Sequence, residues 1–384
     1  EEITSVYKKY ATCMSVLTDE KYFQGSYQYL EYVRSQVEQP LICKDFFIDE
    51  YQVYLARLSG GDAILLMLSV LDDEQYLALH KVADSLNMSV LTEVSNEQEV
   101  SRALALNASL IGINNRDLRD LSTDLATTER LRQLIPNDKV VISESGIYTH
   151  KDVKRLAPLC DGFLIGSSLM AERDLEAACR KVILGENKVC GLTRSQDAMA
   201  AYASGAVYGG LIFYPKSPRY VDIDCAKQVT QSAPLAYVGV FVNAPLEQVV
   251  DYAQSLKLAA VQLHGDENSE YIQSLRKQLP LGCEIWKAQA VKGELPKPLE
   301  GVDRHLYDTY SKSQKGGTGE AFDWSVLETA TVPFMLAGGL NPENIHAALY
   351  RGANGLDLNS GVEASAGKKC QTKLQNAFSH IRNY

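Results

Sequence analysis

The chain has 384 residues, of which 46% are hydrophobic and 22% are charged, and its formal net charge is −10 at pH 7. This length allows two or three domains with a large core. The negative charge argues against nucleic acid as the main partner, and no apolar run reaches the roughly 18 residues of a membrane span. The eight cysteines and six histidines lack CxxC and metal-ligand spacing. We therefore expect reduced thiols in a cytoplasmic protein, with no metal and no other cofactor.

Seven short apolar segments alternate with helical patterns in the first half of the chain. The segments are residues 13–17, 41–43, 64–68, 90–92, 110–113, 140–142 and 163–165. Helical patterns such as 73–85 and 96–106 separate them. Continuous apolar strands divided by helices are typical of a parallel sheet buried on both faces. Because residues 3–10 look like the end of an amphipathic helix, we expect one further βα unit to precede Glu1.

The same alternation restarts at residues 187–194 and gives eight more segments. They are residues 188–190, 210–213, 237–241, 260–263, 284–287, 305–308, 334–337 and 355–358. Eight βα units close a (βα)8 barrel. The predicted fold class is therefore α/β, with two tandem (βα)8 TIM barrels of which the first is incomplete. The predicted domains are residues 1–186 and 187–384.

Both arrays end in glycine-rich loops after their last two strands. Residues 143–147 precede 165–168 in the first array, and residues 337–340 precede 359–362 in the second. Glycines here let backbone N–H groups converge on a phosphate, although tight turns with positive φ also require glycine. Because the pattern recurs at the same place, we predict two phosphate sites. Their residues are Gly166 and Ser167 in the first array, and Gly338, Gly339, Asn359, Ser360 and Gly361 in the second.

Motifs at the strand ends resemble two known families. The motifs of the first half resemble those of indole-3-glycerol phosphate synthase. They are SVLTD at 15–19, CKDF at 43–46, LTEV at 91–94, GINNRDL at 112–118 and SESGI at 143–147. The motifs of the second half resemble those of phosphoribosylanthranilate isomerase. They are CGLT at 190–193, GVF at 239–241, VQLHG at 261–265, AGGL at 337–340 and SGVE at 360–363. Their order is similar to that of the fused bifunctional enzyme of tryptophan biosynthesis in enteric bacteria.

The resemblance implies two consecutive reactions. The second half would isomerise N-(5-phosphoribosyl)anthranilate to 1-(2-carboxyphenylamino)-1-deoxyribulose 5-phosphate by an Amadori rearrangement. The first half would decarboxylate and cyclise that product to indole-3-glycerol phosphate. We accordingly expect phosphorylated anthranilate-sugar substrates, no nucleic acid or membrane partner, and a monomer.

An Amadori rearrangement requires an acid at the ring oxygen and a base at carbon. The resemblance implies Cys190 as the general base and Asp308 as the general acid. From the residues alone, a cysteine in an apolar strand is more often inert core, and Asp308 could be a helix N-cap. The resemblance also implies that Arg219 clamps the anthranilate carboxylate and that His264 shapes the pocket. A solvated arginine and a structural histidine are the alternatives.

The synthase reaction requires a proton donor for carbonyl activation, and an acid and a base for dehydration. The resemblance implies Lys44 as the principal acid, with Glu93 assisting the dehydration. Asn114 and Glu144 would orient the substrate, and Ser145 would meet its phosphate. A lone lysine at a strand end is otherwise usually solvated, but several ionisable residues at C-terminal strand ends favour a site.

One departure from the synthase pattern limits this interpretation. The family's first strand carries a glutamate, a lysine and a Ser-Pro-Ser loop, and no such segment occurs in these 384 residues. We therefore expect the first barrel to lack appreciable synthase activity in this chain. One alternative is an isomerase whose first array is a non-catalytic phosphate-binding or scaffolding domain. A Schiff-base aldolase built on Lys44 or Lys287 is another. Residues 315–319, with 322–324, are expected to form a mobile loop.

Overall fold

The computed structural model describes residues 1–117, 119–309 and 323–383. The chain divides into two compact units, Glu1–Cys179 and Arg180–Tyr384, and the division falls within helix α10 (Leu175–Leu184). The loop expected at residues 315–319 lies outside the described residues. Each unit is organised around its own parallel sheet.

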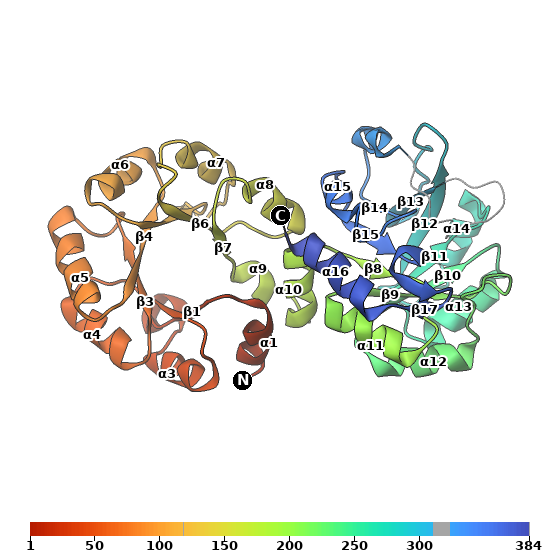
Figure 1. The fold of residues 1–384 in the computed structure, drawn as a ribbon, viewed down its shortest axis with the longest axis horizontal. Helices are drawn as coiled ribbons and strands as arrows, with labels where there is room; N and C mark the ends of the chain where they lie inside the picture. The colour runs from red at the N-terminus through yellow and green to blue at the C-terminus, as the bar shows by residue number, and fades with distance from the viewer. Residues whose placement is uncertain (118, 310–322, 384) are drawn as a thin grey trace. The chain divides into compact units, whose positions relative to one another are not determined.

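The first unit contains a seven-stranded parallel sheet whose strands pair in chain order (Figure 1). The strands are β1 (Met14–Leu17), β2 (Leu41–Lys44), β3 (Ala63–Met67), β4 (Ser89–Val94), β5 (Leu110–Asn114), β6 (Val140–Glu144) and β7 (Gly162–Leu164). Each lies within two residues of its predicted segment. Because the strands are parallel, the polar residues at or next to the ends of β2, β4, β5 and β6 all lie at one edge of the sheet.

The helices of the first unit alternate with these strands. They are α1 (Glu2–Tyr10), α2 (Glu20–Phe23), α3 (Tyr27–Gln36), α4 (Glu50–Leu58), α5 (Asp73–Ser85), α6 (Glu97–Ala105), α7 (Ala126–Arg132), α8 (His150–Leu156), α9 (Ser167–Met170) and α10. Local sequence explains several starts. Asp49, Asp72 and Thr149 form capping boxes at the N-termini of α4, α5 and α8, which satisfy backbone N–H groups that have no partner within the helix.

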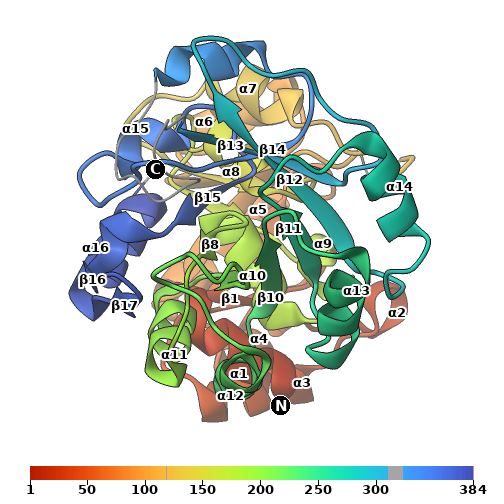
Figure 2. The same cartoon turned by 90° about the vertical axis from the view of Figure 1, so that its right-hand side faces the viewer.

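The second unit is a closed eight-stranded barrel (Figure 2). Its strands are β8 (Lys188–Val189), β9 (Tyr208–Ile212), β10 (Ala236–Phe241), β11 (Ala260–Leu263), β12 (Glu284–Val291), β13 (Arg304–Thr309), β14 (Phe334–Leu336) and β15 (Gly355–Leu358). Closure occurs where β15 pairs with β8, with Asp357 opposite Lys188. The predicted fold of two tandem TIM barrels, seven strands in the first and eight in the second, is confirmed.

Helices surround this barrel, and a hairpin follows its last strand. The helices are α11 (Ser195–Ser204), α12 (Ile223–Ser232), α13 (Leu246–Ser255), α14 (Ser269–Arg276), α15 (Ile345–Leu349) and α16 (Gln371–Arg382), with short 3₁₀ turns η1 (Trp324–Thr329) and η2 (Ser360–Val362). The hairpin strands are β16 (Glu363–Ser365) and β17 (Lys368–Lys369). Among the described helices, none has the length and apolar character needed to cross a membrane.

Alternation along the strands divides the second barrel's core into two layers. Outward residues such as Val189 and Val261 pack in the cluster beneath the helices. Inward residues such as Val238, Trp286 and Met335 fill the barrel itself. The Trp286 ring is fully buried and lies edge-on to Tyr208, with ring centroids 4.9 Å apart. Because this apolar plug fills the barrel interior near the start of the strands, the open space lies at their C-terminal ends.

Candidate active sites

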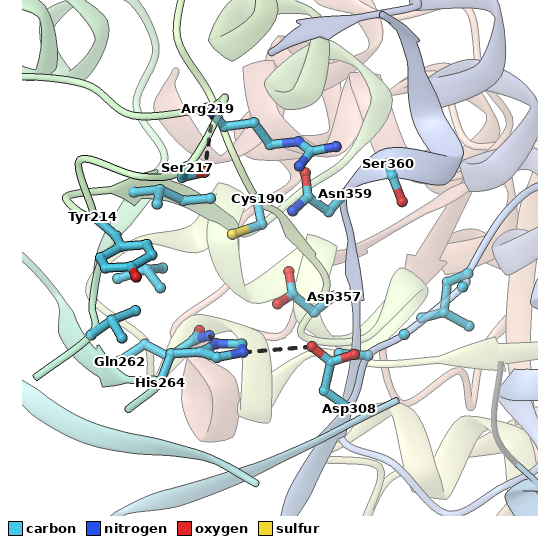
Figure 3. A pocket seen from close by; sticks show the side chains of 17 residues that line it. Cys190, Tyr214, Ser217, Arg219, Gln262, His264, Asp308, Asp357, Asn359 and Ser360 are labelled. Atoms are coloured by element: carbon cyan, nitrogen blue, oxygen red, sulfur yellow. Dashed lines mark hydrogen bonds and ion pairs between the residues drawn. The ribbon is translucent and has the colours of Figure 1, made fainter. Parts of the chain in front are cut away.

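A pocket lies at the C-terminal ends of the second barrel's strands (Figure 3). It brings together side chains from β8, β11, β13 and β15 and from the loops after β9 and β14. Of the predicted residues of this half, the pocket is lined by Cys190, Arg219, His264, Asp308, Gly338, Gly339, Asn359 and Ser360. Gly361 does not line it. Residues far apart in the sequence therefore share one cavity.

Cys190 directly follows β8 and faces the barrel interior, because the preceding residue, Val189, packs outward. The residue is only 5% exposed. Burial raises its pKa, and the positive charge of Lys188 opposes that effect. Room for the sulfur comes from β9, where a Cβ on Gly210 would lie 2.7 Å from Sγ.

Asp308 occupies the opposite wall of the pocket, near the end of β13. The pKa of its carboxyl is raised to about 6, mainly by burial and also by the charge of Asp357, against the opposing effect of a hydrogen bond from the Thr309 backbone N–H. The Nε2 atom of His264 lies 3.7 Å from its Oδ2. Gly338 has φ +89°, and a Cβ there would lie 2.8 Å from Oδ1 of Asp308. A carboxyl with this pKa can act as a general acid near neutral pH.

Arg219 lies in the loop after β9 and is only 7% exposed, which argues against the alternative of a solvated arginine. Its Nε and Nη2 atoms bind Glu363 at 2.9 and 2.8 Å, and Lys369 binds the same carboxylate at 2.8 Å. The remaining nitrogen, Nη1, hydrogen-bonds to no residue that the structure describes. Gly191 allows this arrangement, since it has φ +70° and a Cβ there would lie 2.7 Å from Cδ of Arg219. The guanidinium is thus held rigidly at the pocket wall with one nitrogen left for a ligand.

Two consecutive glycines form the loop after β14. Gly338 and Gly339 have φ of +89° and +65°, which only glycine adopts readily. The Asn344 side chain donates a hydrogen bond to the Gly339 carbonyl at 2.9 Å and fixes that peptide. Neither glycine N–H donates to another residue in the described part of the chain. Beside them, Asn359 accepts a hydrogen bond from Lys369 at 3.0 Å. The loop therefore offers fixed backbone donors and a nearby cation, which suit an anion.

Four predicted residues of the first barrel meet at the C-terminal edge of its sheet. Lys44 ends β2, and its Nζ lies 3.1 Å from Oε2 of Glu144, which ends β6. The side chain of Asn114, from the end of β5, donates to Oε1 of Glu93 in β4 at 3.2 Å. Lys44 keeps 24% of its side chain exposed, whereas the Glu144 side chain is fully buried. The cluster thus has an accessible ammonium above buried carboxylates.

Burial and mutual charge set the ionisation of this cluster. The pKa of Glu93 is raised to about 7, first by burial and then by the charge of Glu144, while the charge of Lys44 opposes both. Burial alone would lower the pKa of Lys44, but the charges of Glu144 and Glu93 raise it overall. Gly112 in β5 gives Glu144 its space, because a Cβ there would overlap Oε1 of that carboxylate. Glu93 can therefore exchange a proton near neutral pH while Lys44 stays charged.

The strand-end motif of the first barrel contains a residue to which sequence analysis gave no role. Asn115 is buried, and its Nδ2 lies 3.0 Å from each of the Ser143 hydroxyl and the carbonyls of Glu144 and Ser145. Its Oδ1 accepts from the backbone N–H and the hydroxyl of Thr128. The amide thus fixes the backbone that carries Glu144. Its place beside Asn114 in the GINNRDL motif was the available signal.

The predicted phosphate residues of the first barrel are less closely organised. Ser145 has φ +66°, and its N–H donates to the Leu164 carbonyl at 3.4 Å. Gly166 and Ser167 are exposed at the start of α9, and a Cβ on Gly166 would meet nothing within 4 Å. Among the described residues, no hydrogen bond or ion pair joins these two to the Lys44–Glu144 pair. They border open space beyond the ionisable cluster.

The aldolase alternative is not supported at Lys287. Its Nζ donates to the Gly265 carbonyl at 2.7 Å and the Leu263 carbonyl at 3.4 Å, and it pairs with Glu267 at 2.9 Å. A Schiff-base lysine needs a free amine that faces the substrate. This ammonium is instead a buried structural group.

Two parallel sheets of the barrel type, each with ionisable side chains at its C-terminal edge, define a tandem TIM-barrel enzyme that carries out acid–base chemistry. The family model described as indole-3-glycerol phosphate synthase matches residues 1–182. The model described as N-(5'phosphoribosyl)anthranilate (PRA) isomerase matches residues 187–380.

Curated relatives extend this match over the whole chain. The tryptophan biosynthesis protein TrpCF of Vibrio cholerae is 57% identical over 383 residues, which cover 100% of this chain and 81% of that protein. TrpCF of Vibrio parahaemolyticus is 59% identical over 387 residues, which cover 100% and 80%. The solved phosphoribosyl anthranilate isomerase of Thermus thermophilus is 31% identical and covers 52% of this chain and 98% of that one, with a TM-score of 0.46.

The chain belongs to the TrpCF family of bifunctional tryptophan biosynthesis enzymes. It combines a carboxy-lyase, indole-3-glycerol phosphate synthase, with an isomerase, phosphoribosylanthranilate isomerase. The family membership confirms the predicted enzyme classes. The alternative of an isomerase with a non-catalytic first array is not favoured, because the synthase family model matches that array. The expected lack of synthase activity in this chain is not favoured either, because relatives named as the bifunctional TrpCF protein match the chain over its whole length.

Proposed function

We propose that Cys190 and Asp308 carry the isomerase reaction as general base and general acid. The observation that carries this proposal is their position on opposite walls of one pocket. Asp308 protonates the ring oxygen of N-(5-phosphoribosyl)anthranilate, which opens the furanose ring. Cys190 then takes the proton from C2′, and the enol formed rearranges to the ketose product. A pKa of about 6 for Asp308 supports its role, since a fraction of the carboxyl is still protonated near neutral pH.

The surrounding groups suggest how the substrate lies. The Arg219 guanidinium, fixed by Glu363, faces the anthranilate carboxylate with its remaining nitrogen. The loop with Gly338 and Gly339 binds the phosphate, with Asn359, Ser360 and Gly361 completing that site. His264, beside Asp308, contacts the sugar and shapes the pocket. The two ends of the substrate are thereby held on either side of the reacting carbons.

In the first barrel, we propose that Lys44 is the principal acid of ring closure. Its partly exposed ammonium can donate to the substrate carbonyl, while Glu144 orients it. Glu93, with a pKa of about 7, assists the later dehydration. Asn114 orients Glu93 through its amide, and Ser145, Gly166 and Ser167 form the side that meets the phosphate.

The test of the isomerase assignment is a pair of substitutions assayed in the 384-residue chain. Cys190→Ala and Asp308→Asn should each lower isomerase kcat by about 10²- to 10⁴-fold, as expected for loss of a general base or acid. Synthase activity, measured on the same preparation, is the internal control for folding. An isomerase rate within tenfold of the parent protein in Cys190→Ala would contradict the proposed base.

We further propose domains at residues 1–186 and 187–384, in a monomeric cytoplasmic enzyme. The boundaries are supported by the family matches, which end at residue 182 and restart at residue 187. The cytoplasm is supported by the eight cysteines, none of which forms a disulfide. Light scattering after size-exclusion chromatography should give the mass of one chain, and the mass of two chains would contradict the monomer.

A further inference from the structure

A buried ion pair lies inside the second barrel next to the proposed base. Lys188 and Asp357 face each other across the β15–β8 pairing that closes the barrel. Their Nζ and Oδ2 atoms are 2.9 Å apart, and the Lys188 side chain is fully buried. Neither residue has a role in the mechanism above, although Asp357 lines the pocket beside Cys190 (Figure 3).

Stability alone is a weak reason for this pair. Desolvating two charges costs several kcal/mol per ion, and well-packed apolar residues often replace a buried pair without loss of stability. Many of the inward side chains of the barrel are apolar, with Trp286, Val238 and Met335 as examples. One charged pair placed beside the pocket therefore calls for a functional account.

Backbone geometry brings the lysine and the cysteine together. Alternation along β8 directs Lys188 and Cys190 to the same interior side, with Val189 facing outward between them. Both pack against one glycine, because a Cβ on Gly210 would lie 2.7 Å from Sγ of Cys190 and 2.9 Å from Cε of Lys188. The ammonium and the thiol are thus buried neighbours inside the barrel.

A base at this position has an electrostatic difficulty, since the reactive species is the thiolate and burial favours the thiol. The charged groups that act on Cys190 come from several elements. Lys188 and Lys369 lower its pKa, Asp357 raises it, and Arg219 also interacts with it. Lys369 and Arg219 are both bound to Glu363, which offsets their charge. Asp308 and His264 form the far wall. Lys188 is the strongest of the cationic influences on the sulfur.

We propose that Lys188 and Asp357 are positioning residues that set the ionisation of Cys190, with the Lys188 ammonium stabilising the thiolate and Asp357 holding and partly offsetting that ammonium. The Oδ1 atom of Asp357 is buried and hydrogen-bonds to no residue that the structure describes. This leaves the second carboxylate oxygen free to respond when the charge on Cys190 changes. The inference deepens the proposed role of Cys190 as the general base and rests on it.

The test is the pH dependence of Cys190 alkylation in the full 384-residue chain. Iodoacetamide is the probe, and the peptide that contains Cys190 is quantified by mass spectrometry, since exposed Cys13 also reacts. Lys188→Met should raise the pH midpoint of alkylation by about one unit or more, which makes the reaction about tenfold slower at a fixed pH below the midpoint. Asp357→Asn should lower the midpoint.

The opposite signs separate an electrostatic role from a packing role. Damage to packing would alter accessibility and change the alkylation rate at every pH, without moving the midpoints in opposite directions. Lys287→Met is the matched control, because it breaks another buried lysine–carboxylate pair of the same barrel, with Glu267 at 2.9 Å, and should leave the midpoint within about 0.3 unit of the parent value. Midpoints that move in the same direction, or stay within that range in both pair variants, would overturn the proposal.

Two further measurements keep the inference distinct from the proposed function. In Lys188→Met, the acid limb of the pH profile of isomerase kcat/KM should move to higher pH together with the alkylation midpoint. If Cys190→Ala retains isomerase activity, the general base assignment fails, while the alkylation midpoint still reports whether the ion pair controls the thiol. Lys188→Gln keeps a polar side chain and replaces Lys188→Met if circular dichroism shows that the methionine variant is unfolded.

Discussion

In the first barrel Lys44 pairs with Glu144 at the mouth of the site, whereas in the second Lys188 pairs with Asp357 inside the barrel. The two N–O distances are similar, at 3.1 and 2.9 Å, but the exposure differs. Lys44 is 24% exposed and can reach a substrate, whereas Lys188 is fully buried and can reach only its neighbours. Similar ion pairs thus serve different purposes, since the first contains the proposed acid and the second controls the proposed base.

A second contrast concerns the loops after β14 in the second barrel and after β6 in the first, each of which follows the last strand but one of its sheet. Gly338 and Gly339 turn the isomerase loop with two positive φ angles in succession. In the synthase the loop after β6 uses Ser145 and Gly146, with φ of +66° and +75°, and Asn115 holds the backbone from below. A non-glycine residue at positive φ is strained, so the synthase loop depends on its buried amide.

The largest expected effect concerns the two lysines. Lys44→Met should lower synthase kcat by about 10³-fold, because a general acid typically contributes 10²- to 10⁴-fold, and raising the pH should not restore the rate. Lys188→Met should lower the isomerase rate by about tenfold near neutral pH, with recovery at higher pH as the thiol ionises. Steady-state assays of both reactions between pH 6 and pH 9 would check this. If the synthase rate of Lys44→Met recovered at high pH, as the isomerase rate of Lys188→Met should, the two ion pairs would no longer differ in their roles.

A second prediction concerns Asn115. Asn115→Ala should lower the free energy of unfolding of the first unit by about 3 kcal/mol, because the Thr128 and Ser143 hydroxyls and two carbonyls lose a buried partner. Both tryptophans, Trp286 and Trp324, belong to the second unit. Urea unfolding followed by circular dichroism should therefore show an earlier first transition, with the tryptophan fluorescence transition unchanged. Ser101→Ala, which removes an exposed hydroxyl, should leave both transitions in place.

The third prediction uses two buried carboxyls with raised pKa values, Glu93 at about 7 and Asp308 at about 6. Each folded pKa exceeds the value in the unfolded chain, so the stabilising effect of the neutral form is present at low pH and is lost as pH rises through the folded value. Glu93→Gln and Asp308→Asn keep the hydrogen-bond acceptor without the charge. Each should raise the free energy of unfolding by about 2 kcal/mol at pH 8.

Below about pH 4, near the unfolded pKa of a carboxyl, the same variants should match the parent protein in stability. Thermal unfolding followed by circular dichroism for Glu93→Gln, and by tryptophan fluorescence for Asp308→Asn, would check both ends of the range. If each substitution changes the free energy of unfolding by the same amount at pH 4 and pH 8, the pKa of neither carboxyl is raised in the folded protein. Both variants should lose activity although they are more stable at pH 8. This combination would show that each native carboxyl lowers the stability of the protein while it serves catalysis.

The smallest expected effect compares two glycines of the first barrel. Gly112→Ala should destabilise that unit by about 1–2 kcal/mol, because the added methyl group overlaps the Glu144 carboxylate and overpacking has costs of that size. Gly166→Ala should change stability by less than about 0.5 kcal/mol, since the added group meets no atom within 4 Å and φ is −132°. Urea unfolding followed by circular dichroism would check this. Equal effects at both positions would contradict the close packing of Glu144.

Much of the fold was predictable because a parallel sheet buried on both faces requires continuous apolar strands. The segments at 13–17 and 260–263, for example, appear as β1 and β11 within one residue. Cys190, Asp308, Lys44 and Glu93 received their roles from the resemblance to the two families. They are polar or reactive residues at the ends of apolar runs, where the strands of a barrel open towards a ligand.

The partners of these residues could not be found in this way. Glu363 was visible only as the last residue of the SGVE motif, and its contact with Arg219 joins positions 144 residues apart. The burial of Arg219 was hidden for the same reason, since the hairpin of β16 and β17 carries the groups that bury it. Phosphate roles for Gly166 and Ser167 remain predictions, because these residues border open space in the structure.

The sequence by itself determined the two βα arrays, their order and the polar residues at their strand ends, because strand periodicity and motif spacing are local properties of the chain. Only the tertiary structure decided which charges meet. Lys188 and Asp357 lie 169 positions apart and become neighbours where β15 closes the barrel against β8. In that buried interior a neighbouring charge acts far more strongly than it would in water. The ionisation of Cys190 is therefore set by barrel closure, which no local pattern encodes.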